Sequence, residues 1–431
     1  MEKEKMLYDT HERPTIGKWL ILAFQHIFAM FGATILVPIL VNGAATEILG
    51  KEVEVLTIPL TLLASGIGTI IYILCTKGKS PVYLGSSFAY ITPIAMAFVA
   101  GGHSSVVSGL VVVGIVYILV AMAIKFFGTK WINKILPPVI VGPMIMIIGF
   151  SLAPNAIKQM GLGAEVLEWR IILVGIITFL ITALTAVGAK GFFKVIPFLI
   201  GIVGGYIAAI IFGIVDFKAL IEAPLIEIPK VLLPVKDYNF TYIGLLSIIP
   251  IALVTIAEHI GDHMALSNII GKDLLKDPGL ERTLLGDGLA TMASGLIGGP
   301  ANTTYGENTS VVGMTKVASV WVIGLAAVIT IILSFFGKIT ELLRTIPDPV
   351  IGGVSLLLYG FIAINGLKII LKNKINYENI RNVVITSAMF IIGLGTSVLE
   401  TTSLPLTGMS LAAIVGIVLN LILPGKDKKE A

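Results

Sequence analysis

The amino-acid sequence predicts an all-α polytopic membrane protein with 14 transmembrane segments in a 7+7 inverted repeat and short β-strands in the third and tenth spans. Three observations lead to this fold class. Hydrophobic residues make up 56% of the 431 residues and charged residues only 13%. Apolar runs of about 17–23 residues, the length needed to cross hydrocarbon, recur along the chain. Three short motifs of the first half also return, in the same order, in the second half.

The apolar runs define the expected spans. Spans 3 and 10 are the least continuous, because each opens with a polar segment that contains Gly or Pro. The approximate bounds are 19–41, 56–76, 82–100, 105–124, 135–153, 171–188, 195–215, 243–265, 283–299, 301–317, 318–337, 349–367, 382–396 and 407–423.

The distribution of Lys and Arg predicts the orientation, because cytoplasmic loops carry an excess of both. With the N-terminus inside, 22 of the 30 Lys and Arg residues fall in inner segments. We therefore expect a multi-pass protein of the plasma (cytoplasmic) membrane with both termini cytoplasmic. No metal-ligand spacing, nucleotide loop or nucleophile arrangement is visible. We expect no enzyme activity, no cofactor, no metal and no nucleic-acid partner.

The internal repeat relates three pairs of motifs, one each in spans 1 and 8, 3 and 10, and 5 and 12. Because each half holds seven spans, an odd number, the second half enters the membrane inverted. Inverted repeats are typical of secondary transporters, whose substrate site lies near the midplane where the halves meet. Channels and receptors stay open at this stage. The pairs are Gln25-His26-Ile27 with Glu258-His259-Ile260, Ser86-Ser87-Phe88-Ala89 with Thr303-Thr304-Tyr305-Gly306, and Pro138-Val139-Ile140 with Pro349-Val350-Ile351.

Four ionisable side chains occur within six residues of span 8: Glu258, His259, Asp262 and His263. A charge at the centre of a membrane helix costs roughly 2.5–3.5 kcal/mol on insertion scales, so such a cluster indicates function. The i,i+4 spacing places Glu258 and Asp262 on one helical face and the two histidines on a neighbouring face. The alternative is a solvated structural cluster at the end of the span.

Span 10 opens with Gly298-Gly299-Pro300, which breaks a helix, and continues through β-branched Thr303 and Thr304. Extended backbone at membrane depth is tolerated only where it is buried in protein or lines a cavity. Residues 81–88 of span 3 offer a partner strand. Helices that start after each strand would direct their N-terminal N–H groups at the site. A pair of ordinary kinked helices is the alternative.

The polar groups of these spans favour a planar neutral heterocycle, such as a nucleobase, over an anion or a sugar. Glu258 and Glu307 accept hydrogen bonds from ring N–H groups, backbone amides donate to carbonyl oxygens, and Phe88, Tyr305 or Tyr359 offers an aromatic face. Carboxylates this close together cannot all ionise in a low dielectric, so at least one is expected to bind a proton that drives uptake.

Several other polar residues have two possible roles. Gln25 and His26 are expected either to support the binding residues from behind or to pack within span 1. Asp287 is expected to be a cap or a network residue and not a substrate contact. Lys316 is expected to be a solvated cation on the inner face, with a gating ion pair as the alternative.

The sequence resembles the nucleobase–ascorbate transporter family (nucleobase:cation symporter-2), and within it the bacterial uracil permeases, over nearly its whole length. Two departures stand out: Ser310 replaces the usual Gly of the family motif, and Asp262 stands where similar uracil permeases have His. The marks of the resemblance are Gln25-His26 followed by residues 28–33, then Gly85-Ser86-Ser87-Phe88, Ala257-Glu258-His259, and Asn302 through Asn308.

The resemblance implies proton-coupled uptake of uracil and a homodimer formed through a gate domain. It implies a core domain of residues 1–131 and 239–340 (spans 1–4 and 8–11) and a gate domain of residues 132–238 and 341–431 (spans 5–7 and 12–14). The implied substrate-binding residues are Glu258, Glu307, Phe88, Gly306, Tyr305, Ala33, Ser87 and Tyr359. The implied proton-coupling residues are Glu307, Glu258, Asp262, His259 and His263, and the residues supporting them are Gln25, His26, Asn308 and Thr304.

Two rival functions stay open. A carrier of xanthine or another purine would share the fold and differ in substrate. An anion exchanger or channel would share the 7+7 architecture but would favour cations at the helix ends, where this chain has acids.

Overall fold

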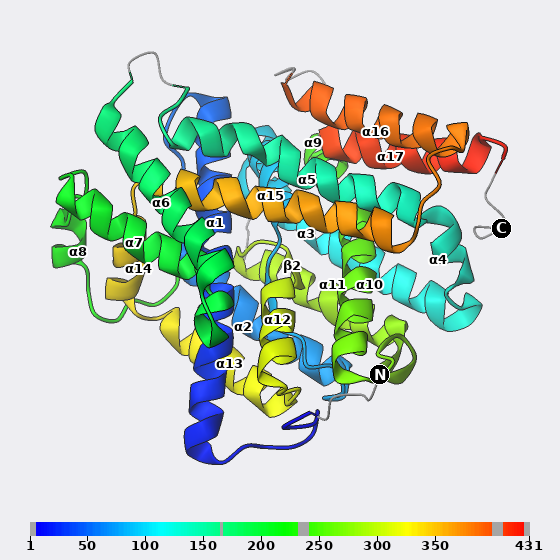
Figure 1. The fold of residues 1–431 in the computed structure, drawn as a ribbon, viewed down its shortest axis with the longest axis horizontal. Coiled ribbons are helices and arrows are strands. Elements are labelled where there is room, and N and C mark those ends of the chain that lie inside the picture. The colour runs from blue at the N-terminus through cyan, green and yellow to red at the C-terminus, as the bar shows by residue number, and fades with distance from the viewer. Residues whose placement is uncertain (1–5, 164–166, 232–240, 399–407, 426–431) are drawn as a thin grey trace.

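The computed structural model describes residues 6–163, 167–231, 241–398 and 408–425, a mostly helical chain (Figure 1). The elements of the first half are α1 (Ile16–Leu49), α2 (Ile58–Cys75), β1 (Leu84–Ser86), η1 (Phe88–Tyr90), α3 (Ile91–Phe127), α4 (Lys130–Ile135), α5 (Pro138–Gln159), α6 (Trp169–Gly188), η2 (Gly191–Lys194), α7 (Pro197–Ile211) and α8 (Lys218–Glu222). Those of the second half are α9 (Tyr242–Ile248), α10 (Ile251–Ile270), η3 (Leu275–Gly279), α11 (Leu280–Ile297), β2 (Asn302–Thr304), α12 (Gly306–Thr315), α13 (Val320–Leu333), α14 (Gly337–Arg344), α15 (Asp348–Lys372), α16 (Ile380–Val398) and α17 (Gly408–Ile422).

Among the described residues, seven helical stretches are long and apolar enough to cross a membrane, or eight if α13 and α14, bent by 83°, form one span. The longest, Phe88–Phe127, joins the expected spans 3 and 4. It is broken at Gly101 and Gly102, where the φ of Gly102 is +65°, a conformation that glycine adopts without strain. Several other expected spans correspond to helices of 10–17 residues, such as α7 and α17. The count of fourteen therefore stays a prediction.

Helices α5 and α15, which carry the third pair of repeated motifs, lie side by side and antiparallel (Figure 1). Their backbones approach so closely that glycine is required. A Cβ on Gly142 would lie 3.0 Å from the carbonyl oxygen of Gly366, and a Cβ on Gly352 would lie 2.8 Å from that of Ala156. Small residues allow this kind of close helix packing in membrane proteins.

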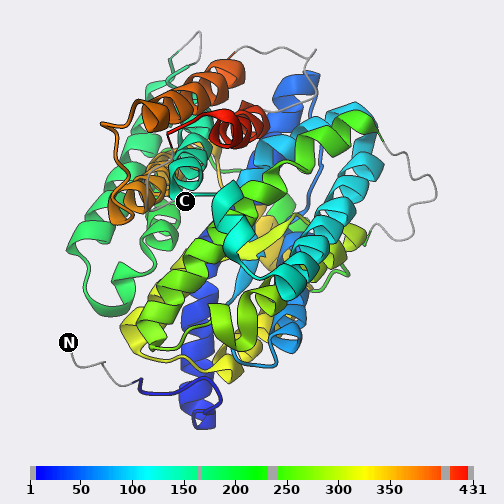
Figure 2. The same cartoon turned by 90° about the vertical axis from the view of Figure 1, so that its right-hand side faces the viewer.

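The helices pack in two groups. Helices α1, α2, α3, α9, α10, α11, α12 and α13 contact one another, as do α5, α6, α7, α15, α16 and α17. The second group, with α16 and α17 in orange and red, lies on the left in Figure 2, and the first group lies on the right. The groups meet where α1 contacts α7 and where α10 contacts α5 and α17. These contacts place α10 at the boundary between the groups.

Residues 7–12, here called the N-terminal strap, run along the link between α12 and α13. The backbone N–H of Leu7 donates to the carbonyl oxygen of Lys316 at 2.7 Å. The ammonium of Lys272, just beyond α10, donates to a carboxylate oxygen of Asp9 at 2.6 Å. This ion pair and hydrogen bond lower the pKa of Asp9 below its ordinary value of 3.8. The strap thus joins α10 to α12 at one end of the molecule.

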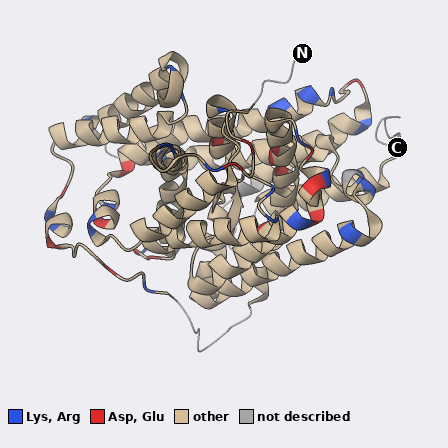
Figure 3. Ribbon diagram, turned by 90° about the horizontal axis from the view of Figure 1, so that it is seen from below, with Lys and Arg blue, Asp and Glu red and all other residues tan. Residues whose placement is uncertain are grey.

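Charged residues are sparse along the helices. Figure 3 shows long stretches of helix without a charged side chain, and Lys and Arg are denser toward the right-hand side of that view. Large apolar side chains such as Phe127, Leu184 and Ile391 are exposed on the helix surfaces. Exposed apolar surface on long apolar helices is what a lipid-facing exterior requires.

Candidate functional site

Two short antiparallel strands lie at the centre of the first helix group. Strand β1 pairs with β2 in the register Leu84↔Thr304, Gly85↔Thr303 and Ser86↔Asn302. All six residues are buried. Because buried backbone groups need hydrogen-bond partners, the two extended segments stabilise each other at a depth where water is absent.

Each strand leads directly into a helix. Strand β1 is followed by η1 and α3, and β2 is followed by α12, which starts at Gly306. The first N–H groups of a helix have no partner within that helix and carry a partial positive charge. Phe88 and Gly306, at these two starts, both line the same cavity. A Cβ on Gly306 would meet nothing within 4 Å, so the backbone there faces open space.

The cavity has a volume of about 1780 Å³ and lies between the two helix groups. The first group contributes a cluster of three carboxylates to its lining, Glu258 and Asp262 from α10 and Glu307 from the first turn of α12, and Asp273, in the link after α10, also lines it. The three clustered carboxylates are half-buried. The second group contributes apolar side chains, including Ile145 of α5 and Phe361 of α15. The cavity is therefore acidic on one wall and apolar on the other.

The three carboxylates differ in their partners. The hydroxyl of Thr304 donates a hydrogen bond to Asp262 at 2.5 Å. Glu307 lies in the first helical turn, close to its own backbone N–H. The carboxylate of Glu258 accepts no hydrogen bond from the described residues. Glu258 and Glu307 are thus available to a ligand, while Asp262 is already held by β2.

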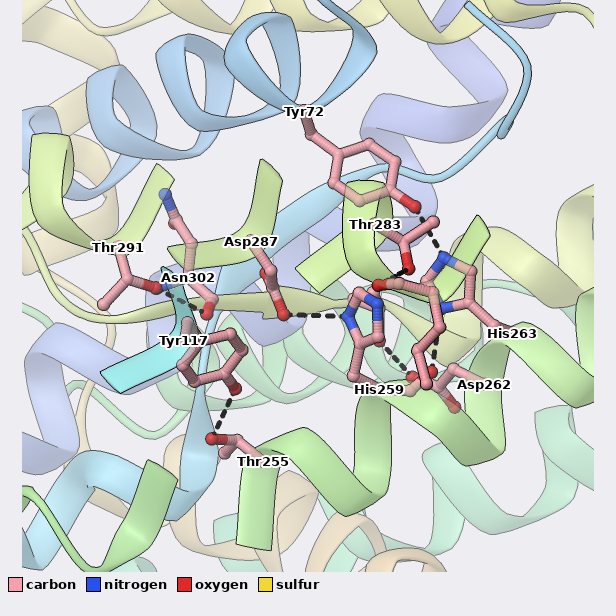
Figure 4. A network of polar contacts seen from close by, with 12 residues as sticks. Tyr72, Tyr117, Thr255, His259, Asp262, His263, Thr283, Asp287, Thr291 and Asn302 are labelled. Atoms are coloured by element: carbon pink, nitrogen blue, oxygen red, sulfur yellow. Dashed lines mark hydrogen bonds and ion pairs between the residues drawn. The ribbon is translucent and has the colours of Figure 1, made fainter. Parts of the chain in front are cut away.

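The two histidines of α10 lie behind the cavity wall, fully buried (Figure 4). His259 Nδ1 is 3.0 Å from a carboxylate oxygen of Asp287 on α11. His263 Nε2 is 2.5 Å from the hydroxyl of Tyr72 on α2. The two imidazole rings stack with their centroids 4.0 Å apart. This arrangement attaches α10 to α2 and α11 on the side facing away from the cavity. Asp287 is thereby a network residue.

The expected aromatic residues do not all face the cavity. The backbone of Tyr305 is at the cavity wall, but its hydroxyl is 3.1 Å from Ser86 Oγ and 3.2 Å from Thr34 Oγ1 inside the first helix group. Tyr359 is buried on α15, where its carbonyl oxygen faces Gly149 of α5. Of the three aromatic candidates, Phe88 and Tyr305 line the cavity and Tyr359 does not.

The remaining candidates lie near the site without lining the cavity. Ala33 and Ser87 are buried within the first helix group. The amide nitrogen of Asn308 donates to the carbonyl oxygen of His26 and lies 3.1 Å from its Nδ1, which joins α12 to α1. Gln25 Oε1 is buried without a hydrogen-bond partner among the described residues. These residues position the backbone around the site.

The structure also adds cavity residues that were not among the expected binding residues. Ala257, Gly261 and Thr303 line the acidic wall, and Phe198 and Leu358 line the apolar wall. Apolar positions of this kind resemble every other lipid-facing or packing residue in the sequence. Tyr72 is a polar example, and only the fold reveals its contact with His263. In the part of the chain that the structure describes, no group of three or more His, Cys, Asp or Glu residues could hold a metal ion.

The chain is similar to a known protein family and to several proteins within it. The model of a family described as "Permease family" matches residues 17–402. The uracil permease of Bacillus caldolyticus is 45% identical over 431 residues, covering 98% of this chain and 96% of its own. That of Bacillus subtilis (strain 168) is 44% identical, covering 100% and 98%, and that of Escherichia coli (strain K12) is 40% identical, covering 95% and 92%.

Solved structures resemble the fold at low sequence identity. The transmembrane domain of the cyanobacterium bicarbonate transporter BicA matches with a TM-score of 0.56 at 15% identity, over 88% of this chain and 97% of that chain. The murine anion transporter Slc26a9 in its inward-facing state matches with a TM-score of 0.62 at 10% identity, over 95% and 68%. These matches bear on the architecture alone.

Proposed function

The chain belongs to the permease family whose model matches residues 17–402, and from that membership we propose that it imports uracil by proton symport. It is a multi-pass membrane transporter and not an enzyme. The observation that supports the substrate is the set of carboxylates at the cavity wall, beside the starts of two helices. The uracil permeases that are 40–45% identical to the chain supply the choice of nucleobase.

Uracil is a planar neutral ring with two N–H groups and two carbonyl oxygens, and the site offers a complement to each. Glu258 and Glu307 would accept the N–H groups, because neither carboxylate is taken by another side chain among the described residues. The backbone N–H groups at Phe88 and Gly306 would donate to the carbonyl oxygens, as helix starts do. The Phe88 ring would lie alongside the base.

The proton would bind among the same acids. Three carboxylates on one cavity wall repel one another, so a protonated state is needed in at least one of them. Asp262 is the acid that we assign to proton coupling together with Glu258 and Glu307, and Thr304 orients it. A change of protonation at these acids would reach His259 and His263 through α10, because both side chains lie on the buried side of that helix. The proposed driving force is the proton gradient, and the proposal includes no cofactor.

The proposed architecture has fourteen spans and two domains. The core domain would comprise residues 1–131 and 239–340 and the gate domain residues 132–238 and 341–431, with the boundary near 238 outside the described residues. The two helix groups and the cavity between them support this division. Lysine-bearing segments that the Lys and Arg distribution assigns to the cytoplasm, such as Lys130 to Lys134 and Lys368 to Lys372, line part of the cavity. We therefore propose cytoplasmic termini, an inward-facing state and a homodimer formed through the gate domain.

The test is uptake of radiolabelled uracil into proteoliposomes with and without an inward proton gradient. Uptake raised by the gradient and blocked by unlabelled uracil, but not by xanthine or hypoxanthine, is the expected result. Gradient-driven uptake of a purine would show that the substrate is a purine and would leave the proposed proton symport unchanged. Uptake that ignores the gradient would remove proton symport from the proposal.

Anion exchange is the alternative that the predicted 7+7 architecture leaves open. The acidic wall opposes it, because an anion beside three carboxylates would be repelled. Uptake of labelled bicarbonate or chloride into the same proteoliposomes separates the two functions.

A further inference from the structure

Six lysines line the cavity, on elements that the Lys and Arg distribution assigns to the cytoplasmic side, and form what we call the lysine collar. They come from four separate elements, so the collar is a product of the fold and not of one basic segment. In the described part of the chain, Lys276 pairs with Asp273 at 3.2 Å and Lys368 has a long hydrogen bond to Asn365 at 3.4 Å. The collar residues are Lys130 and Lys134 of α4, Lys194 of η2, Lys276 of η3, and Lys368 and Lys372 of α15.

The cavity extends along the helices that line it. Glu258 and Ile269 both line the cavity on α10, and 11 residues of helix span about 16 Å. Leu358 and Lys368 both line it on α15, a span of about 15 Å. The volume of about 1780 Å³ also exceeds the roughly 300–1,000 Å³ typical of pockets for drug-sized molecules. A single nucleobase would leave most of this cavity to water.

The two ends of the cavity carry opposite charge. Glu258, Asp262 and Glu307 line one end, and the lysine collar lines the cytoplasmic end together with the single carboxylate of Asp273. A ligand that matches both ends has an N–H group on a neutral ring and several negative charges farther along the cavity, because lysine side chains reach inward from the helix ends. Uridine nucleotides have this chemistry, since the ribose occupies N1 and the N3–H of the ring is left to donate.

We propose that the cavity also binds uridine nucleotides from the cytoplasmic side, with the remaining ring N–H of the base donating to one of Glu258 and Glu307 and the phosphates on the lysine collar. This inference rests on the proposed function, since the base would use the uracil site. A bound nucleotide would be an inhibitor and not a substrate, because moving phosphate charges past the midplane is costly. The transporter would then slow down when the products that the cell makes from the imported base accumulate.

The experiment measures equilibrium binding of radiolabelled uracil to the purified protein in detergent, where both faces are accessible. Uridine, UMP, UDP and UTP are added as competitors at low ionic strength, because salt screens exposed charges. We expect competition to strengthen with each added phosphate and to weaken in high salt. Tripolyphosphate and ATP are the controls for charge without the correct base. Either control competing as well as UTP would overturn the proposal, as would competition equal to that of uridine for all three nucleotides.

Variants separate the collar from the base site. The triple variant K194Q/K368Q/K372Q should bind uracil unchanged and should need about tenfold more UTP for the same competition, the sum of a few exposed ion pairs. The matched control K51Q/K218Q/K230Q removes three exposed lysines that do not line the cavity, and it should behave as wild type. Unchanged UTP competition in the collar variant would overturn the proposal. Failure of uracil itself to bind would refute the proposed function instead, and the two failures are therefore distinguishable.

Discussion

Thr304 donates a hydrogen bond to Asp262 across 2.5 Å and thereby joins β2 to α10 at the cavity wall. The contact links a short buried strand to the helix that carries both Glu258 and Asp262. A change in the charge of Asp262 is therefore felt directly by the strand pair. This makes Asp262 the most informative position for the coupling of proton and substrate.

Asp262→Asn should keep the hydrogen-bonding capacity and remove the ionisable group. We expect uracil binding to persist and uptake to lose most of its acceleration by an inward proton gradient. Uptake measured from pH 5 to 8 in proteoliposomes checks this, with Thr304→Ser as the control that keeps a hydroxyl. A wild-type pH profile in Asp262→Asn would make this carboxylate merely structural.

Glu258→Ala and Glu307→Gln should each abolish most uracil binding. A hydrogen bond to a charged group is worth roughly 1.5–3 kcal/mol, so a loss of about 10–100-fold in affinity is expected for each variant. Isothermal titration calorimetry in detergent measures the effect. Glu378→Ala, on an exposed loop, is the matched control. Wild-type affinity in either site variant would exclude that carboxylate from the base site.

Gly85 in β1 and Gly306 at the start of α12 should differ in how an added side chain changes the stability of the protein. A Cβ on Gly85 would collide with the ring of Tyr305, so Gly85→Ala should destabilise the protein by about 1–3 kcal/mol through overpacking. Gly306→Leu places its side chain in open cavity, so the protein should fold normally and bind uracil weakly. Thermal melting of both variants, followed by uracil binding, tests the pair. An equal loss of stability in Gly85→Ala and Gly306→Leu would contradict this prediction.

Asp9→Asn should weaken the attachment of the N-terminal strap at neutral pH. The ion pair with Lys272 lowers the pKa of Asp9, so its contribution to stability is present above the ordinary value of 3.8 and is lost as the pH falls below it. An exposed pair is worth about 0.2–1 kcal/mol, and salt reduces it further. We expect a small drop in melting temperature at pH 7 that shrinks as the pH falls from 3.8 through the lowered pKa of Asp9. A difference that does not shrink over this range would show that the ion pair is not its cause.

Tyr72→Phe should test the buried side of α10. The variant removes the hydroxyl that lies 2.5 Å from His263 Nε2 and leaves that nitrogen without a partner. An unsatisfied buried group costs about 1–3 kcal/mol. We expect a lower melting temperature with unchanged uracil affinity, because Tyr72 does not line the cavity. A normal melting temperature with altered pH dependence of uptake would assign Tyr72 to proton coupling instead.

The polar residues of the site could be selected from the sequence because each violates the rules for a membrane helix. Glu258 and Asp262 are charges within an apolar run, and Gly298-Gly299-Pro300 interrupts one. The structure brings Glu258, Asp262 and Glu307 to one cavity and contains strand pairs at the interruptions. Such local violations are visible without knowledge of the fold.

Side-chain direction could not be predicted in the same way. Tyr305 and Tyr359 both belong to sequence segments near the site, yet the hydroxyl of one bonds to Ser86 and the other is buried against α5. The contact of His263 with Tyr72 joins residues 191 positions apart. Such contacts depend on how helices pack, and the periodicity of a single span carries no information about its neighbour.

The N-terminal strap sets an order on biosynthesis. The carbonyl oxygen of Glu12 accepts a hydrogen bond from Ser319, and the two residues are 307 positions apart. At roughly 5–20 residues per second, the ribosome needs about 15–60 s to make the intervening chain. During that time the strap lacks the segment between α12 and α13 on which it docks. The first segment synthesised is therefore fixed in place only after α12 has been made.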